Sequence, residues 1–202
     1  MAKLSVKLDN YLFATERQEK ITFDDLMTLA GESIFGFLLA VLSFPSALPI
    51  PAPGYSIPFG ILIFLLGMQL ATGAKTPWLP KRLKKGAMKK TMAQNFFKKG
   101  LPWLQKIENI TKPRLTYICN TPLGKVFLGV IIALMGISMM IPIPGTNTAP
   151  AMGVFIIGFG LQEDDGLICL AGFIVALIAG ILSASIIIGA IWGSTNLLEM
   201  IR

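Results

Sequence analysis

The sequence predicts an all-α integral membrane protein, and three observations support this fold class. Hydrophobic residues make up 53% of the 202 residues. Charged residues make up only 14% of the chain, against about 25% in soluble domains. The mean hydropathy is +0.67, and the uncharged stretch at residues 167–191 is 25 residues long. We expect a single membrane domain over residues 1–202, because the chain is too short to add a separate soluble catalytic domain.

The amino-terminal region leads into the first apolar helix. We expect no cleavable signal peptide, because acidic residues interrupt the first 25 residues and leave no continuous apolar core. Thr22 followed by Asp25 is typical of a helix start. Residues 33–44 are then uncharged, residues 57–71 are apolar again, and a segment rich in helix-breaking residues separates them: Pro49, Pro51, Pro53, Gly54 and Pro58. This pattern predicts a helical hairpin.

A basic linker follows the first hairpin. Residues 75–114 contain 12 of the 18 Lys and Arg residues and the single acid Glu108. The positive-inside rule places such a linker in the cytoplasm, against anionic membrane lipids, and we expect no nucleic-acid binding. Apolar residues interspersed over residues 91–118 favour a basic amphipathic helix in the headgroup region, so we assign residues 75–118 to an interfacial linker. The alternative is a solvated linker.

The rest of the chain forms a second hairpin and a final helix. Thr121 and Pro122 mark a helix start, residues 126–141 are uncharged, and residues 151–161 are apolar up to an acidic cluster, Glu163 to Asp165. We interpret this cluster as a solvated helix end, with a cation-binding mouth as the alternative. Residues 167–191 predict a full transmembrane helix of about 37 Å.

An internal repeat relates the two hairpins. Residues 28–69 align without a gap on residues 121–162, and 11 of the 42 positions are identical. The matches include Pro, Gly, Gln and Thr, which shared hydrophobicity does not explain. They are Thr28/Thr121, Gly31/Gly124, Gly36/Gly129, Ala40/Ala133, Pro49/Pro142, Ile50/Ile143, Pro51/Pro144, Gly60/Gly153, Ile63/Ile156, Gly67/Gly160 and Gln69/Gln162.

The returning arm of the second hairpin is too short to cross a bilayer. About a dozen residues precede Glu163, which corresponds to roughly 17 to 18 Å against a hydrocarbon core of about 30 Å. We therefore expect two re-entrant or broken helical hairpins whose turns shelter each other, because lipid cannot satisfy free backbone groups. The alternative is that the hairpins cross fully and that the turns are surface loops.

The turns supply the candidate binding residues. The returning arms are expected to begin near Ser56 and Pro150, and the open helix ends favour an anionic group. Discontinuous helices with polar turns are typical of transporters. We assign substrate binding to polar and glycine residues at the turns, to two glutamines at the ends of the returning arms and to one acid near the membrane: Gly54, Tyr55, Ser56, Gly145, Thr146, Asn147, Thr148, Gln69, Gln162 and Glu32. The glutamines could equally tie each arm to a neighbour.

Enzyme chemistry is not expected. The chain has no histidine and no nucleophile motif, so we predict no catalytic residue, no metal site and no cofactor. The two cysteines, Cys119 and Cys169, are 50 residues apart in unlike sequence surroundings, and we interpret both as structural. Gly189 and Gly193 form a small-residue pair suited to packing within the chain or, in a homodimer, between two copies.

The motifs resemble the ExoD family of bacterial membrane proteins, named for exopolysaccharide synthesis. The resemblance covers nearly the whole chain and rests on LPIPAPG at residues 48–54, PWLP at 77–80, IPIPGTN at 141–147 and EDDGL at 163–167. The Lys-rich linker departs from the Arg-rich linker expected in the family. The resemblance implies a multi-pass protein of the bacterial inner membrane with a link to polysaccharide export, and it supplies no substrate.

Two functions follow as hypotheses. The first is a transporter-like protein that moves a small polar or anionic solute, or a lipid-linked precursor, between the two hairpins. The second is a non-transporting scaffold of a polysaccharide synthesis or export complex, which acts through the basic linker. The orientation of the repeats stays open: simple parity favours parallel repeats, whereas inverted repeats would require residues 91–118 to cross the membrane.

Overall fold

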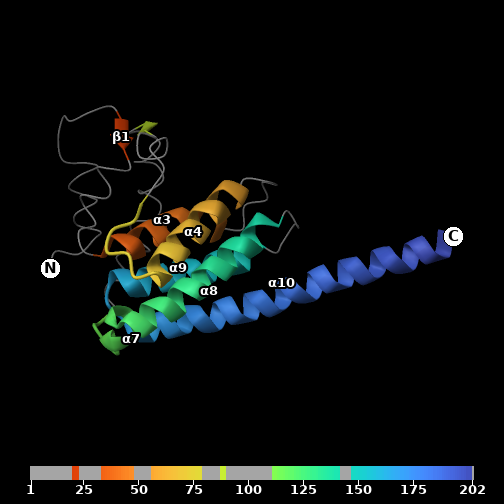
Figure 1. Ribbon diagram of the computed structural model, residues 1–202. Coiled ribbons are helices and arrows are strands. Elements are labelled where there is room, and N and C mark those ends of the chain that lie inside the picture. Colours follow the sequence, from red (N-terminus) through yellow and green to blue (C-terminus); the bar gives the residue numbers. More distant parts are fainter. Residues whose placement is uncertain are drawn as a thin grey trace.

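The computed structural model describes residues 20–22, 33–47, 56–78, 87–89, 111–141 and 147–201. Five long or medium helices form the packed body (Figure 1): α3 (Ile34–Ala47), α4 (Ser56–Ala71), α8 (Pro122–Met140), α9 (Thr148–Gln162) and α10 (Gly166–Ile201). The short helix α7 (Thr116–Asn120) precedes α8. A three-residue antiparallel ribbon pairs β1 (Lys20–Thr22) with β2 (Ala87–Lys89). The body of the protein is therefore all-helical, as the sequence predicts.

The starts of α8 and α10 follow from local sequence. The Thr121 side chain accepts a hydrogen bond from the Gly124 amide at 3.2 Å, and Pro122 takes the first position of α8. At α10, Asp165 Oδ1 accepts hydrogen bonds from the amides of Leu167 and Ile168 at 3.0 and 3.4 Å. Thr121 and Pro122 thus mark a helix start, as expected.

The helices of the two hairpins pair crosswise. Helix α4 packs along α8, and α3 packs along α9, so each hairpin contacts the other through both of its helices. A Cβ atom at Gly67 on α4 would lie 2.6 Å from the Ala133 nitrogen on α8. A Cβ atom at Gly36 on α3 would lie 2.5 Å from the Gln162 nitrogen on α9. Glycine at these positions lets the helix backbones approach closely.

The crosswise pairing encloses an apolar core. Its members are large aliphatic, aromatic and Met side chains that are almost completely inaccessible to solvent: Phe37, Leu38, Leu39, Ile63, Leu66, Leu128, Ile132, Met139, Ile157 and Phe159. Every one of the four hairpin helices contributes to this set, so the core belongs to both hairpins together. Neither hairpin has a described core of its own.

Helix α10 lies on the outside of the bundle, along α9, and extends well beyond it (Figure 1). Two segments are long and apolar enough to cross a membrane, Pro122–Met140 and Gly166–Gly189. Large apolar side chains on the outer faces of α8 and α10 are exposed, including Leu134 at 53% and Ile181 at 59%. Lipid tails provide a suitable environment for such faces, which supports a membrane protein.

Several boundaries refine the sequence predictions. Helix α4 begins at Ser56 as expected, whereas α9 begins at Thr148 and has 15 residues, somewhat longer than predicted. Helix α8 is also long and apolar enough to span a membrane, in addition to the final helix that the sequence predicts. It reaches this length because it begins at Pro122 and includes Pro122 to Lys125 before the uncharged run. Most of the interfacial linker, including residues 91–110, lies outside the described residues.

Candidate functional site

The helix ends that flank the two proline-rich turns lie at one end of the bundle, which we call the turn end. A Cβ atom at Gly60, near the start of α4, would lie 3.1 Å from Met139 Cβ, near the end of α8. The rings of Phe44 on α3 and Phe155 on α9 lie 5.6 Å apart between centroids. Paired helices therefore run antiparallel, and the helix ends that flank the two turns lie on the same side. The turns themselves, residues 48–55 and 142–146, lie outside the described residues.

Three buried oxygen atoms near the turn end have no hydrogen-bond partner in the described structure: Ser46 Oγ, Ser138 Oγ and Asn147 Oδ1. Ser46 is 1% exposed and Ser56, the first residue of α4, is 4% exposed. Ser43 provides a contrast, because its hydroxyl donates to the Leu39 carbonyl at 2.6 Å. Buried polar atoms normally have a protein, water or ligand partner, so the turn end has unused hydrogen-bonding capacity.

At the turn end, the end of α8 and the start of α9 do not reach as far as the apolar span of α10. Gly153 packs against Ala176, so Thr148 lies level with about residue 181 of α10 by the helical rise. Met135 contacts the Gly180 position, which places the end of α8 level with about residue 185. The apolar span of α10 continues to Gly189. The helix ends therefore stop roughly 6 to 12 Å before the end of that span.

The structure places five of the ten predicted binding residues. Ser56, Asn147 and Thr148 lie at the turn end of the bundle, at the starts of α4 and α9. Asn147 occupies the cap position of α9, but its side chain makes no capping hydrogen bond. The other five predicted residues lie outside the described part of the chain: Gly54, Tyr55, Gly145, Thr146 and Glu32.

The two predicted glutamines lie at the opposite end of the bundle and differ in their contacts. Gln69 Nε2 donates to the Trp78 carbonyl at 3.0 Å, and Gln69 Oε1 accepts from the Trp78 amide. Gln69 therefore ties the segment after α4 to the end of that helix. The equivalent Gln162 has a buried Oε1 without a partner among the described residues.

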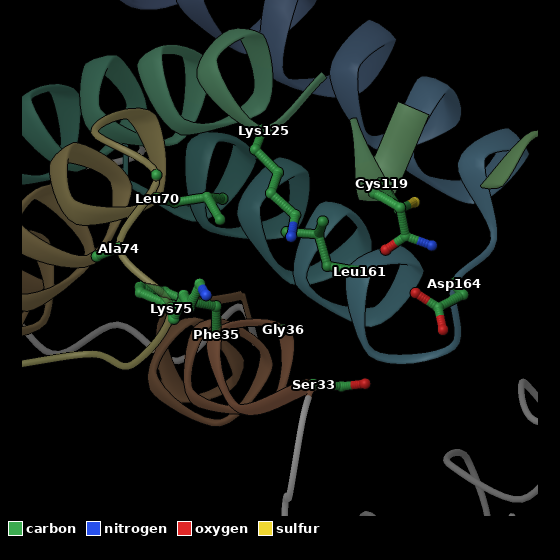
Figure 2. Close-up of a pocket in the computed structure, with 12 residues that line it drawn as sticks. Ser33, Phe35, Gly36, Leu70, Ala74, Lys75, Cys119, Lys125, Leu161 and Asp164 are labelled. Carbon is green, nitrogen blue, oxygen red and sulfur yellow. The ribbon is translucent and has the colours of Figure 1, made fainter. Parts of the chain in front are cut away.

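A pocket of about 120 Å³ opens at this opposite end, which we call the lysine end (Figure 2). The starts of α3 and α8, the ends of α4 and α9, and α7 all contribute to its wall. The Lys125 side chain reaches from α8 into the space between Leu70 and Leu161 (Figure 2). The polar lining residues are Ser33, Lys75, Cys119, Asn120, Lys125 and Asp164.

The electrostatics of this pocket favour an anion on its lysine side. Lys75 and Lys125 form no ion pair with a carboxylate within the part of the chain that the structure describes. Asp164 lines the other side of the pocket in Figure 2. Ser33 and Asn120 add neutral hydrogen-bonding groups. Two ammonium groups beside donors of this kind suit a carboxylate or phosphate.

Sequence reasoning did not single out this pocket. Lys125 was a detectable signal, because it is the one charged residue between Thr121 and Ile141 in an otherwise apolar helix. Ser33 and Asn120 carry no such signal, because only the crosswise helix pairing brings their segments together.

The structure corrects one sequence interpretation and refines two others. Asp165 is not solvated, because it is 2% exposed, caps α10 and accepts a hydrogen bond from the Lys112 amide at 3.2 Å. The fold also brings together the two cysteines from their unlike sequence surroundings: Cys119 Sγ and Cys169 Sγ are 3.3 Å apart, and both residues are buried. Of the two kinds of packing considered for Gly189, packing within the chain is not found, since a Cβ atom there would meet no described atom within 4 Å.

Comparisons with known proteins place the chain among its relatives. A family model described as "Exopolysaccharide synthesis, ExoD" matches residues 4–185. The chain is 48% identical, over 100% of its length and 95% of the relative, to an uncharacterized protein of Synechocystis. It is 30% identical to Protein ExoD of Rhizobium meliloti over 80% of this chain and 68% of that protein. No solved structure matches.

Proposed function

The chain belongs to the ExoD family, and we propose that it serves exopolysaccharide synthesis as a transport-type protein of the bacterial inner membrane. Its cargo is a small polar or anionic solute, or the anionic headgroup of a lipid-linked precursor. The transfer site lies between the two hairpins, with the turn end and the lysine end as its two openings.

The observation that carries this proposal is the set of unpartnered buried oxygens at the turn end, on Ser46, Ser138 and Asn147. A buried polar group without a hydrogen bond costs roughly 1–3 kcal/mol. These oxygens lie beside the apolar span of α10, where the surrounding lipid tails would supply no hydrogen-bond donor. A hydrated cavity or a bound solute would satisfy all three atoms, and this accounts for polar residues in an apolar bundle.

The pocket at the lysine end supports capture of an anion. Under the positive-inside rule the basic linker and this pocket face the cytoplasm. Lys75 and Lys125 would then meet anionic solutes or lipid headgroups from the cytoplasmic side. The crosswise pairing of α3 with α9 and of α4 with α8 also supports a duplicated pair of re-entrant hairpins, because the pairing is unchanged when the two hairpins are exchanged.

Reconstitution into liposomes tests the transport proposal. Purified protein is assayed for uptake across a panel of amino acids, organic acids and polyprenyl phosphates. We expect Ser56→Leu and Asn147→Leu to abolish uptake of the active compound, because each replaces a polar group at the turn end with a branched alkyl group. Ser185→Leu is the matched control, since Ser185 is exposed on α10 and bonds its own helix at 2.8 Å. Unaltered uptake in both turn-end variants would refute the transfer site.

A scaffold is the second candidate, and the free length of α10 favours it. Helix α10 runs beyond the bundle (Figure 1), and Ile186 and Ile188 on it are 44% and 56% exposed. Such a helix and the basic linker could hold synthesis machinery at the membrane. Replacing Lys84, Lys85, Lys89 and Lys90 with Gln should abolish polysaccharide production by a scaffold, whereas the turn-end variants should not affect it.

A further inference from the structure

The two cysteines of the chain meet in the interior although 50 residues separate them. Cys119 on α7 is 1% exposed, Cys169 on α10 is 0% exposed, and their sulfurs are 3.3 Å apart. The chain contains no third cysteine. Besides the other thiol, each sulfur has one long contact to a carbonyl among the described residues. Cys119 Sγ contacts the Gly160 carbonyl and Cys169 Sγ contacts the Ile157 carbonyl, both at 3.8 Å.

Hydrogen bonds on both sides hold the two helices in this arrangement. The Gly166 amide, at the start of α10, donates to the Arg114 carbonyl at 2.7 Å, just before α7. Asp165 Oδ2 accepts from the Lys112 amide. A Cβ atom at Gly160 would lie 2.7 Å from Cys169 Sγ, so that glycine makes room for the thiol. A disulfide needs sulfurs about 2.05 Å apart, which a shift of little more than 1 Å would supply.

Cys119 lies where the buried core borders a pocket. It lines the pocket at the lysine end, together with Lys75 and Lys125 (Figure 2). The hydrogen bond from Cys169 lowers the pKa of Cys119, and Lys125 acts in the same direction, against burial and the charges of Asp164 and Asp165. The hydrogen bond from Cys169 is the main contribution that favours the Cys119 thiolate, which is the nucleophile in thiol–disulfide exchange.

We propose that Cys119 and Cys169 form a reversible dithiol–disulfide site that opens to the pocket at the lysine end. The Cys119 thiolate attacks a low-molecular-weight disulfide, forming a mixed disulfide and releasing one thiolate. The Cys169 thiol gives its proton to the thiolate released in the first step, and its sulfur then attacks Cys119 Sγ, breaks the mixed disulfide and forms the intramolecular bond. The second external sulfur leaves as a thiolate and takes up the proton that Cys119 had lost to solvent. Two cysteine thiols are thereby oxidised, and one external disulfide is reduced to two thiols.

The bond would fasten α7 to the first turn of α10 and so fix one wall of the pocket. Cross-linking residues far apart in sequence also restricts the unfolded chain. The oxidised protein should therefore unfold at a higher temperature than the reduced protein. This site shares the pocket at the lysine end with the transport proposal but does not rest on it, because the buried oxygens that carry that proposal lie at the turn end and thiol counting measures no uptake.

The test uses the full chain in detergent micelles with hydroxyethyl disulfide as the probe. After incubation, the protein is denatured and its thiols are counted with a polyethylene-glycol maleimide. We expect two labels before treatment and none after it, an intact mass two hydrogens lower, a monomer on non-reducing gels and recovery of both labels with a reductant. Two labels remaining under conditions that oxidise the denatured chain, or disulfide-linked dimers, would overturn the proposal.

Two single variants test the order of attack. Cys169→Ser should stop at one mixed disulfide with the probe on Cys119, visible by intact mass, because no second thiol is present. Cys119→Ser should stay unmodified, because Cys169 does not line the pocket. Equal modification of the two variants would overturn the assignment of Cys119 as the attacking thiol, and the melting temperature of each variant shows whether it is folded.

Discussion

The two contacts between the hairpins differ in how they are built. Between α4 and α8, Gly60 meets Gly136 and Gly67 meets Gly129, so glycines face glycines at two levels seven residues apart. Between α3 and α9, Gly36 meets Gly158 near the lysine end, and the rings of Phe44 and Phe155 meet near the turn end. The first contact therefore has glycines at both levels, whereas the second has glycines near the lysine end and aromatic rings near the turn end.

The difference has a physical cause in α10. The alignment pairs Gly60 and Gly67 with Gly153 and Gly160, but these two glycines face Ala176 and Cys169 on α10. Helix α9 thus lies between α3 and α10, whereas α4 leaves Ile61 and Met68 each 44% exposed. Similar sequences in the two halves therefore make different contacts, because only the second half has α10 beside it among the described residues. Four predictions test this comparison.

The largest effect is expected at the glycine contact between α4 and α8. Gly67→Ala places a methyl group 2.6 Å from the Ala133 backbone, so the helices must separate, at a cost of about 1–3 kcal/mol. Thermal unfolding in micelles, followed by circular dichroism, measures it. Gly189→Ala is the matched control, because that position is open and Ala favours helix. Equal melting temperatures for the two variants would show that α4 and α8 are not in close contact.

A smaller loss of stability is expected at the start of α10, the helix that packs beside the second half of the chain. Asp165→Ala removes the cap of α10 and the acceptor for the Lys112 amide, which should cost about 1–2 kcal/mol. Hydrogen exchange should increase in the first turn of α10 and at Lys112. Thr121→Ala, which removes the cap of α8, is the comparison and should change exchange in α8 only. Protection of α10 that is unchanged in Asp165→Ala would contradict the capping role.

The two aligned glutamines should respond differently to the same substitution. Gln69→Ala breaks two hydrogen bonds to the Trp78 backbone and should cost about 1 kcal/mol. Gln162→Ala removes an oxygen that has no hydrogen-bond partner in the described part of the chain, so its cost should be close to zero. Paired unfolding curves of the two variants measure the difference. A larger loss in Gln162→Ala would mean that this residue has a partner outside the described residues.

The smallest effect on stability is expected at Ser46. Its hydroxyl is buried and has no hydrogen-bond partner among the described residues, so Ser46→Ala should leave the melting temperature unchanged or slightly higher. Ser43→Ala is the matched control, and it should lower stability because the Ser43 hydroxyl donates to Leu39. If Ser46→Ala is stable but reduces solute uptake, its hydroxyl serves transport. A stable Ser46→Ala with full uptake would remove this residue from the transfer site.

Local chemistry allowed part of this structure to be predicted. The α4 start at Ser56 follows from the helix-breaking prolines before it, and the α8 start follows from Thr121 and Pro122. Asn147 and Thr148 were assigned to the same end as Ser56, and the structure places them there. The contacts of Gln69 could not be predicted from the sequence, because a glutamine at a helix end gives no indication of which neighbour will face it.

The sequence by itself determined the membrane class, the apolar helices, the breaks between them and the family, because hydrophobicity, proline and motif spacing act over a few residues. Only the tertiary structure decided that Cys119 lies against Cys169, that Asp165 is buried, and that Lys75 and Lys125 share a pocket. These facts depend on which helix faces meet across long separations in the chain. Glycine backbone contacts and the position of α10 settle that choice, and they exist only once the helices have packed.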